Sequence, residues 1–297
     1  MRIVFFGTPE FAVPSLDAIA RGHEIALVVA QPDKPSGRGM KMHAPPVIVR
    51  ARELGLPTAQ PPKIRSEEFL ASVAALKPDA GVVVAYGRIL PAALLQIPFY
   101  NVHGSVLPKY RGAAPIQRAI EHGDAETGVT IMRVDEELDH GPILLIETTP
   151  IGPDEHTPQL AERLSHIGAD TLARVLRGGY TETPQDHAKA TFAPKIEKQE
   201  GEVRFEERAQ KIYNRFRAFD PWPGVFHGDL KFTDIRATGQ PGNRATPPGT
   251  ILTIDDAVTI SCGEGALRIL ELQRPGKPRT PAAALARGLG WRAGDVL

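Results

Sequence analysis

The sequence predicts a doubly wound α/β domain, built on a mostly parallel sheet, followed by a small β-barrel domain. Three observations support this fold class. Continuous apolar runs alternate with helical patterns in the first part of the chain, a charged stretch without periodicity lies near residue 195, and short β-rich pieces with many glycines and prolines follow it. Apolar runs separated by helices are typical of a parallel sheet covered on both faces. Short, closely spaced strands are typical of a barrel.

The first three strands expected in the first domain are continuous apolar runs, which places them inside a sheet. They are Ile3–Phe6, Ile25–Ala30 and Gly81–Tyr86, with two later strands at Val129–Val134 and Ile143–Thr148. Helical patterns fall between and after them, at Pro9–Ala20, Val47–Leu54, Glu67–Leu76 and Thr157–Leu176. Two glycines, Gly178 and Gly179, are expected to end the last helix.

A length of 297 residues suits two domains. We expect a first domain over residues 1–189, a linker over 190–204 and a second domain over 205–297. The linker contains the charged run Lys195–Gly201. The second domain is expected to hold a helix at Arg208–Phe219 and strands at Gly249–Ile254, Ala257–Cys262 and Ala266–Leu272.

Composition indicates a soluble globular protein, because 42% of the residues are apolar and 24% are charged. The single cysteine, Cys262, allows no disulfide within the chain. The N-terminal residues lack the apolar core of a signal peptide, and no apolar run approaches the roughly 20 residues of a membrane span. We therefore expect a cytoplasmic protein with no membrane partner.

The formal net charge is zero, which by itself argues against a nucleic-acid partner. The charge is nevertheless uneven along the chain. Residues 204–297 hold 14 Lys and Arg against 10 Asp and Glu, and residues 31–50 hold four basic residues against one acidic residue. This distribution is compatible with a basic domain and a basic loop that bind nucleic acid, or with ordinary scatter of surface charge.

The turn after the first strand, Gly7-Thr8-Pro9, lacks the glycine-rich pattern of a dinucleotide site. Only the first glycine is present, and Pro9 and Phe11 would obstruct the approach of a pyrophosphate to the backbone. A Walker A sequence is also missing from the chain. The sequence therefore argues against an NAD or ATP site.

Asn101-Val102-His103 places two polar side chains at the expected end of a strand. Residues i and i+2 of a strand point to the same face, and ligands of open α/β sheets bind at the carboxyl ends of strands. Together with Asp139, these residues suit acyl transfer to an amine. An asparagine amide can donate to a developing oxyanion, a histidine can act as general acid or base, and an aspartate can orient the histidine.

Simpler interpretations of the same residues remain open. His103 can be a hydrogen-bonded core residue, and Asp139 can be a turn residue because it lies close to Gly141. His103, Asp139 and His140 can also be read as metal ligands, although none of the usual ligand spacings is present.

The sequence around Asn101 carries a specific family resemblance. Residues 101–117, which read NVHGSVLPKYRGAAPIQ, closely resemble the central motif of the methionyl-tRNA formyltransferases. Residues 124–132 continue the similarity, and further stretches lie at 6–12, 31–39 and 218–223. The resemblance spans nearly the whole chain and is weakest after residue 225.

This resemblance implies a Rossmann-like first domain that binds folate and an OB-like second domain that helps to hold tRNA. The implied reaction is transfer of a formyl group from 10-formyltetrahydrofolate to the amine of methionyl initiator tRNA, without a metal. We expect a monomer. Alternatives are a formyltransferase for a small amine, such as glycinamide ribonucleotide or an amino sugar nucleotide, and an RNA-binding protein without catalysis.

The resemblance also assigns site residues. It implies Asn101, His103 and Asp139 as catalytic residues, with the amine attacking the formyl carbon directly. The implied folate contacts are Ser105, Val106, Leu107 and Pro108, together with Tyr86, Gly87 and Arg88. The implied tRNA contacts are Lys34, Arg38 and Lys41 in a basic loop.

The chain departs from the family pattern at a few positions. Val106 replaces the usual leucine, and Phe99-Tyr100 is bulkier than the usual approach to the motif. His140 and Pro142 replace a threonine and an aspartate beside Asp139, which puts in question how this loop closes over the pterin. Asp139 itself is retained.

Overall fold

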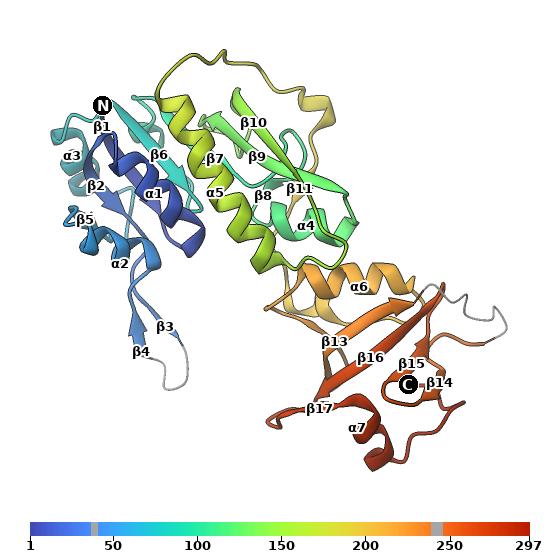
Figure 1. The fold of residues 1–297 in the computed structure, drawn as a ribbon. Helices are drawn as coiled ribbons and strands as arrows, with labels where there is room; N and C mark the ends of the chain where they lie inside the picture. Colours follow the sequence, from blue (N-terminus) through green and yellow to red (C-terminus); the bar gives the residue numbers. More distant parts are fainter. Residues whose placement is uncertain (37–40, 239–245) are drawn as a thin grey trace. The chain divides into compact units, whose positions relative to one another are not determined.

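The computed structural model describes residues 1–36, 41–238 and 246–297. The chain forms two compact units, both visible in Figure 1. The first comprises residues 1–115, 126–150 and 159–194, and the second comprises residues 116–125, 151–158 and 195–297. The main break thus lies within the expected linker, while two short segments from the expected first domain pack with the second unit.

The first unit is built on a seven-stranded sheet with the order β10-β9-β7-β6-β1-β2-β5. The strands β5, β2, β1, β6 and β7 run parallel to one another. In contrast, β9 is antiparallel to β7, and β10 is antiparallel to β9. The strands are β1 (Arg2–Gly7), β2 (Glu24–Val29), β5 (Thr58–Ala59), β6 (Ala80–Val84), β7 (Phe99–His103), β9 (Glu126–Arg133) and β10 (Ile143–Pro150). The predicted doubly wound, mostly parallel sheet is confirmed.

Helices cover both faces of this sheet. On one face, α3 (Glu67–Ala75) packs Phe69 into a core with Phe6 of β1 and Phe99 of β7. On the other face, α5 (Thr157–Leu176) approaches β7 so closely that a Cβ at Gly168 would lie 2.6 Å from Val102. The remaining helices of the unit are α1 (Val13–Ala20), α2 (Pro46–Glu53), η1 (Glu10–Ala12), η2 (Ala92–Leu94) and η3 (His187–Lys189).

Phe99 is expected to contribute strongly to stability. Its ring is 1% exposed and packs against the Phe6 ring, with centroids 5.7 Å apart. Phe99→Ala should lower the free energy of unfolding by about 3–5 kcal/mol, because it removes buried apolar surface and leaves a cavity. Urea denaturation followed by circular dichroism measures this change. Phe192→Ala, which removes a ring that is 67% exposed, is the matched control and should change stability by no more than about 0.5 kcal/mol.

Two small two-stranded sheets complete the first unit. β3 (Lys34–Ser36) and β4 (Lys41–His43) pair antiparallel and flank the basic loop that the sequence singled out. β8 (Arg111–Gly112) pairs parallel with β11 (Phe192–Ala193). The β8–β11 pairing places residues 192–193, near the end of the first unit, beside residues 111–112, which follow Asn101 and His103 in the chain.

The second unit, for which the sequence predicts a small OB-like β-barrel, contains a six-stranded antiparallel sheet. Its core joins apolar side chains of the sheet to α6 (Ala209–Ala218) and α7 (Ala282–Leu289). The strands are β12 (Val225–His227), β13 (Leu230–Thr238), β14 (Ile251–Ile254), β15 (Val258–Ser261), β16 (Ala266–Gln273) and β17 (Arg279–Pro281). α4 (Pro115–His122) and η4 (Lys198–Gly201) contribute an ion pair between Arg118 and Glu200 to this unit.

In the part of the chain that the structure describes, none of the helices combines the length and the apolar character that crossing a membrane requires.

Candidate active site

Asn101 and His103 lie on one face of β7, at its carboxyl end. The alternation of a strand sends Val102, between them, to the opposite face, where it meets Gly168 of α5. His103 is 5% exposed, and Asn101 is partly exposed. The apolar packing of Val102 therefore fixes the strand while its two polar neighbours face the site.

Asp139 reaches the same place from the loop between β9 and β10. Its Oδ1 accepts a hydrogen bond from the Asn101 Nδ2 at 3.3 Å, and its Oδ2 lies 3.6 Å from the His103 Nδ1. The three residues expected to form the catalytic set thus converge, although 38 residues separate Asn101 from Asp139.

A backbone amide also holds the Asp139 carboxylate. The Gly112 N–H donates to its Oδ2 at 2.8 Å. Gly112 has φ +121°, and a Cβ at this position would lie 2.8 Å from the Ala193 carbonyl oxygen. Only glycine satisfies both the conformation and the close approach, so the β8–β11 pairing depends on a glycine at this point.

The geometry of His103 identifies which ring nitrogen faces the site. Its Nε2 lies 2.9 Å from the Tyr110 carbonyl oxygen. A carbonyl can only accept, so Nε2 carries a hydrogen and donates it. The Nδ1 faces Asp139 at 3.6 Å, which is too long for a hydrogen bond. Nδ1 is therefore the nitrogen available for proton chemistry.

Tyr100, the neighbour of Asn101 on β7, keeps its proton. Burial, together with the hydrogen bond between its hydroxyl and that of Tyr180, raises the pKa of Tyr100 to about 12. The phenol is therefore neutral at physiological pH. It serves packing on the face of β7 opposite to Asn101.

The predicted folate residues 105–108 form a tightly bonded loop. The buried Ser105 hydroxyl donates to the Lys109 carbonyl at 2.6 Å, and the Ser105 carbonyl accepts from the Thr130 hydroxyl at 2.7 Å. The Thr130 hydroxyl in turn accepts from the Leu107 N–H at 3.1 Å. Leu107 is buried, and the Pro108 carbonyl accepts from the Thr191 N–H. These bonds set the shape of the loop.

The predicted folate residues Tyr86, Gly87 and Arg88 follow β6. The Tyr86 ring is buried against Phe6, and its carbonyl accepts from the Thr8 hydroxyl and the Gln31 amide. Gly87 has φ +80°, a conformation that favours glycine. In this triplet, Arg88 alone presents a charged side chain.

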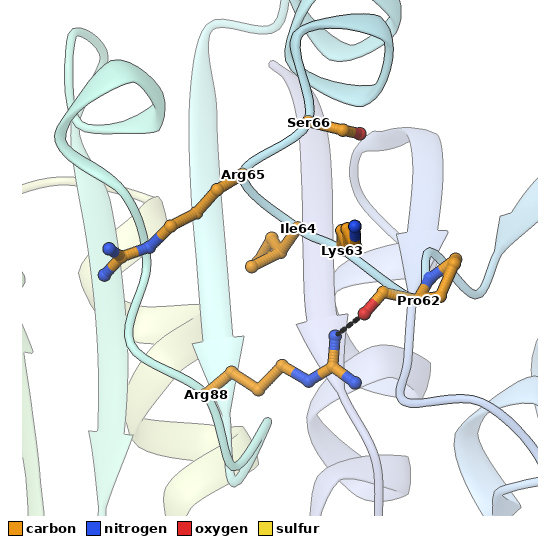
Figure 2. Close-up of a pocket in the computed structure, with 6 residues that line it drawn as sticks. All are labelled: Pro62, Lys63, Ile64, Arg65, Ser66 and Arg88. Atoms are coloured by element: carbon orange, nitrogen blue, oxygen red, sulfur yellow. Dashed lines mark hydrogen bonds between the residues drawn. The ribbon is translucent and has the colours of Figure 1, made fainter.

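Arg88 lines a shallow pocket beside the start of α3, shown in Figure 2. Three of the lining side chains are cationic, those of Lys63, Arg65 and Arg88. The Arg88 Nη1 donates to the Pro62 carbonyl at 3.0 Å and to the Pro61 carbonyl at 3.2 Å, which anchors the guanidinium at the pocket. Three positive charges thus lie around this pocket, whose exposed lining is otherwise mostly apolar.

Two of the three predicted tRNA residues, Lys34 and Lys41, lie in the paired strands β3 and β4. The Lys34 ammonium donates to the Gln31 side-chain oxygen at 3.0 Å, and Lys34 is exposed. Lys41 is the first residue of β4. Arg38 lies outside the described residues.

Comparison with known proteins agrees with this arrangement. The formyl transferase family matches residues 1–176, and the formyl transferase C-terminal domain matches residues 195–290. A methionyl-tRNA formyltransferase from Sorangium cellulosum is 43% identical over 309 aligned residues and covers 100% of this chain and 99% of its own. One from Methylococcus capsulatus is 47% identical and covers 95% of each chain. The chain belongs to the methionyl-tRNA formyltransferase family.

Solved structures share the fold at lower identity. An N-formyltransferase from Helicobacter canadensis, in complex with folinic acid and dTDP-3-aminofucose, aligns with a TM-score of 0.67 at 17% identity, covering 90% of this chain and 98% of its own. HypX from Aquifex aeolicus, in complex with tetrahydrofolic acid, aligns with a TM-score of 0.61 at 19% identity, covering 96% of this chain and 47% of its own.

For this formyltransferase family member, the structure does not favour the metal interpretation of His103, Asp139 and His140. The His140 Nδ1 lies 2.7 Å from the Asp135 Oδ2, and its ring stacks on His187 with centroids 4.0 Å apart. Across the described ranges, no group of three or more His, Cys, Asp or Glu side chains is arranged to hold a metal ion.

Sequence reasoning missed three residues of this site. Arg111, Gln185 and His187 form a hydrogen-bonded group behind Asp139. Arg111 stands inside the family motif, which was a signal that its side chain has a role. Gln185 and His187 lie far along the chain, in a segment that showed no periodic pattern, so nothing local pointed to them.

Proposed function

We propose that this chain transfers the formyl group of 10-formyltetrahydrofolate to the free amino group of methionyl initiator tRNA, for initiation of translation. The convergence of Asn101, His103 and Asp139 at the end of β7 carries the proposal. Relatives that bear the name methionyl-tRNA formyltransferase, 43–47% identical over nearly the full length, support the choice of acceptor.

The residues present fit a folate. 10-Formyltetrahydrofolate supplies an electrophilic formyl carbon on a nitrogen leaving group, and its far end carries glutamate carboxylates. The cationic pocket of Lys63, Arg65 and Arg88 suits such carboxylates. The loop of residues 105–108 would then border the pterin and formyl part of the folate.

Asn101 and His103 stabilise the charge that develops on the formyl oxygen. The Asn101 amide has two hydrogens, and the bond to Asp139 uses one of them, so the second can donate to that oxygen. A proton on the His103 Nδ1 provides a second, charge-assisted donor, because Nε2 is already committed to Tyr110. Fixed donors of this kind act without reorganisation during the reaction.

Asp139 supports both donors. Its carboxylate orients the Asn101 amide and places a negative charge 3.6 Å from the His103 Nδ1. As the bond to the folate nitrogen breaks, the His103 Nδ1 proton passes to the leaving nitrogen, and the Asp139 carboxylate accepts the proton that the attacking amine loses.

The amine attacks the formyl carbon directly. The one serine in the loop after His103, Ser105, has a buried hydroxyl that donates to the Lys109 carbonyl. The chain's one cysteine, Cys262, lies in the core of the second unit, and burial raises the pKa of its thiol to about 12. Neither side chain is an activated nucleophile, so an acyl-enzyme step is not required.

The acceptor end of the tRNA is assigned to the basic hairpin and the second unit. Lys34, Arg38 and Lys41 lie in or between β3 and β4, and residues 204–297 carry more basic than acidic groups. We assign the catalytic role to residues 1–189 and tRNA binding to residues 205–297. The chain acts as a monomer in the cytoplasm, where its acceptor is used.

Arg38→Ala should weaken tRNA binding and leave folate binding unchanged. Without the guanidinium, one tRNA phosphate is no longer neutralised by the protein. The KM for tRNA therefore rises, and the slope of log KM against log salt falls by roughly 0.7–0.9 for each such phosphate. Steady-state assays at several salt concentrations measure both effects. Arg21→Ala, at the end of α1, is the control. Equal tRNA KM values for Arg38→Ala and wild type at every salt concentration would remove Arg38 from the interface.

An acceptor comparison tests the function. The purified chain is incubated with 10-formyltetrahydrofolate carrying a labelled formyl group and, separately, methionyl initiator tRNA, glycinamide ribonucleotide and an amino sugar nucleotide. Label should appear on methionyl initiator tRNA alone. If one of the small amines were labelled and the tRNA were not, the small amine would be the acceptor and the proposed acceptor would be wrong.

A further inference from the structure

A glutamine from the stretch between the two family matches lies directly behind the Asp139 loop. Gln185 falls between residues 176 and 195, the limits of the matched regions. It is 5% exposed. Because a buried amide without partners is costly, the bonds that Gln185 makes indicate what it does.

The Gln185 amide is fully hydrogen-bonded. Its Nε2 donates to the Asp139 carbonyl at 2.9 Å and to the Gly141 carbonyl at 2.8 Å. Its Oε1 accepts from the Arg111 Nε at 3.1 Å and Nη2 at 2.6 Å. Two hydrogens and two lone pairs are all that an amide has, so the side chain has no capacity left for a substrate.

These bonds close a ring around the catalytic carboxylate. Gln185 holds the backbone of Asp139 and the side chain of Arg111, and the next residue, Gly112, donates its N–H to the Asp139 carboxylate. Asp139 adopts φ +50°, which is uncommon for a residue with a Cβ. An unfavourable conformation persists where its surroundings enforce it, and the Gln185 bond to the Asp139 carbonyl does so here.

We propose that Gln185 is a positioning residue for formyl transfer, which holds the Asp139 loop against β8 so that the carboxylate stays in reach of Asn101 and His103. This role rests on the proposed function. The surrounding segment adds to it, since the Thr191 hydroxyl and carbonyl accept from the N–H groups of Tyr110 and Arg111. Residues 185–191 thus hold both the Asp139 loop and the backbone at Tyr110 and Arg111.

Gln185→Glu separates positioning from folding. A glutamate keeps acceptor oxygens for Arg111 and gains a charge-assisted pair there. It has neither amide hydrogen, so a carboxylate faces the carbonyls of Asp139 and Gly141. The loop should shift, and a displacement of about 1 Å can cost roughly 10²-fold in rate. We expect kcat to fall by about 10-fold to 10²-fold, with the KM values for folate and tRNA changed by no more than about twofold, because the Gln185 amide makes all its hydrogen bonds within the protein.

Two further variants complete the experiment. Gln96→Glu makes the same chemical change at an exposed amide of the first unit, which donates to the Ala92 carbonyl at 3.4 Å, and should keep wild-type kcat. Gln185→Met removes the hydrogen bonds at similar volume and should reproduce the loss of kcat. This variant tests the positioning role if Gln185→Glu does not fold. Thermal unfolding of each variant establishes the folded fraction, and kcat is expressed per folded molecule.

The possible outcomes are distinct. A lowered kcat with unchanged KM values, in folded Gln185→Glu or Gln185→Met, supports the positioning role. Wild-type kcat in a folded variant, with only a lower unfolding temperature, would show that Gln185 is structural and overturn the inference while the proposed function stands. A wild-type chain that transfers no formyl group to methionyl initiator tRNA would overturn the function and the positioning role together.

Discussion

Asn101→Ala is expected to lower kcat by about 10²–10³-fold, the usual effect of removing one oxyanion donor. The formyl oxygen gains negative charge only as the amine attacks, so the Asn101 hydrogen bond belongs mainly to the transition state. Binding of the ground-state substrates should therefore change little. Steady-state kinetics with saturating folate and varied methionyl-tRNA separate kcat from KM.

Gln96→Ala is a suitable control for this variant. It removes an exposed amide of the same unit, which donates to the Ala92 carbonyl at 3.4 Å. Its kcat should equal that of wild type. If Asn101→Ala kept near-normal turnover while remaining folded, Asn101 would not be the oxyanion donor. The proposed mechanism would then lack its main group for stabilising the formyl oxygen.

Asp139→Asn is expected to lower kcat by about 10²-fold or more, the lower end of what general acid–base catalysis contributes. The change keeps the volume of the side chain and removes its charge. The Asn101 amide donates to one oxygen of Asp139 and the Gly112 N–H to the other, so an asparagine would place an NH2 group against one of these two donors. It also removes the negative charge beside the His103 Nδ1.

Rapid-quench measurement of the single-turnover rate tests this variant. It reports the chemical step and excludes product release. Asp17→Asn removes a carboxylate that pairs with Arg50 on the surface of the same unit and should leave the rate unchanged. A single-turnover rate for Asp139→Asn within about threefold of wild type would assign Asp139 a structural role.

Much of the fold follows from local patterns in the sequence. The apolar runs that became β1, β2, β6, β9 and β10 are long enough to identify without tertiary information. The alternation rule alone placed Asn101 and His103 on one face of a strand. By contrast, β13 and α7 were not predicted: β13 mixes polar and apolar residues along its length, and α7 is a short alanine-rich helix.

The site was only partly predictable, for physical reasons. Asp139 joins Asn101 through a loop that carries no periodic signal, so only the family resemblance linked them. The donor from Gly112 is a backbone N–H, which residue identity does not reveal. Gln185 meets Asp139 across 46 residues. Ser105 illustrates the opposite case, because the structure directs its hydroxyl into the loop, and a folate contact by this side chain stays a prediction.

A single-turnover experiment with excess enzyme tests the central claim most directly. The enzyme is mixed with 10-formyltetrahydrofolate that carries a labelled formyl group and with methionyl initiator tRNA, and the reaction is quenched in acid at intervals. The label should pass from folate to the methionyl amine in one phase, with none bound to the protein at any time, and Asn101→Ala should slow that phase. Labelled protein that forms and decays at the rate of product formation, or label that never reaches the tRNA, would contradict direct formyl transfer at Asn101, His103 and Asp139.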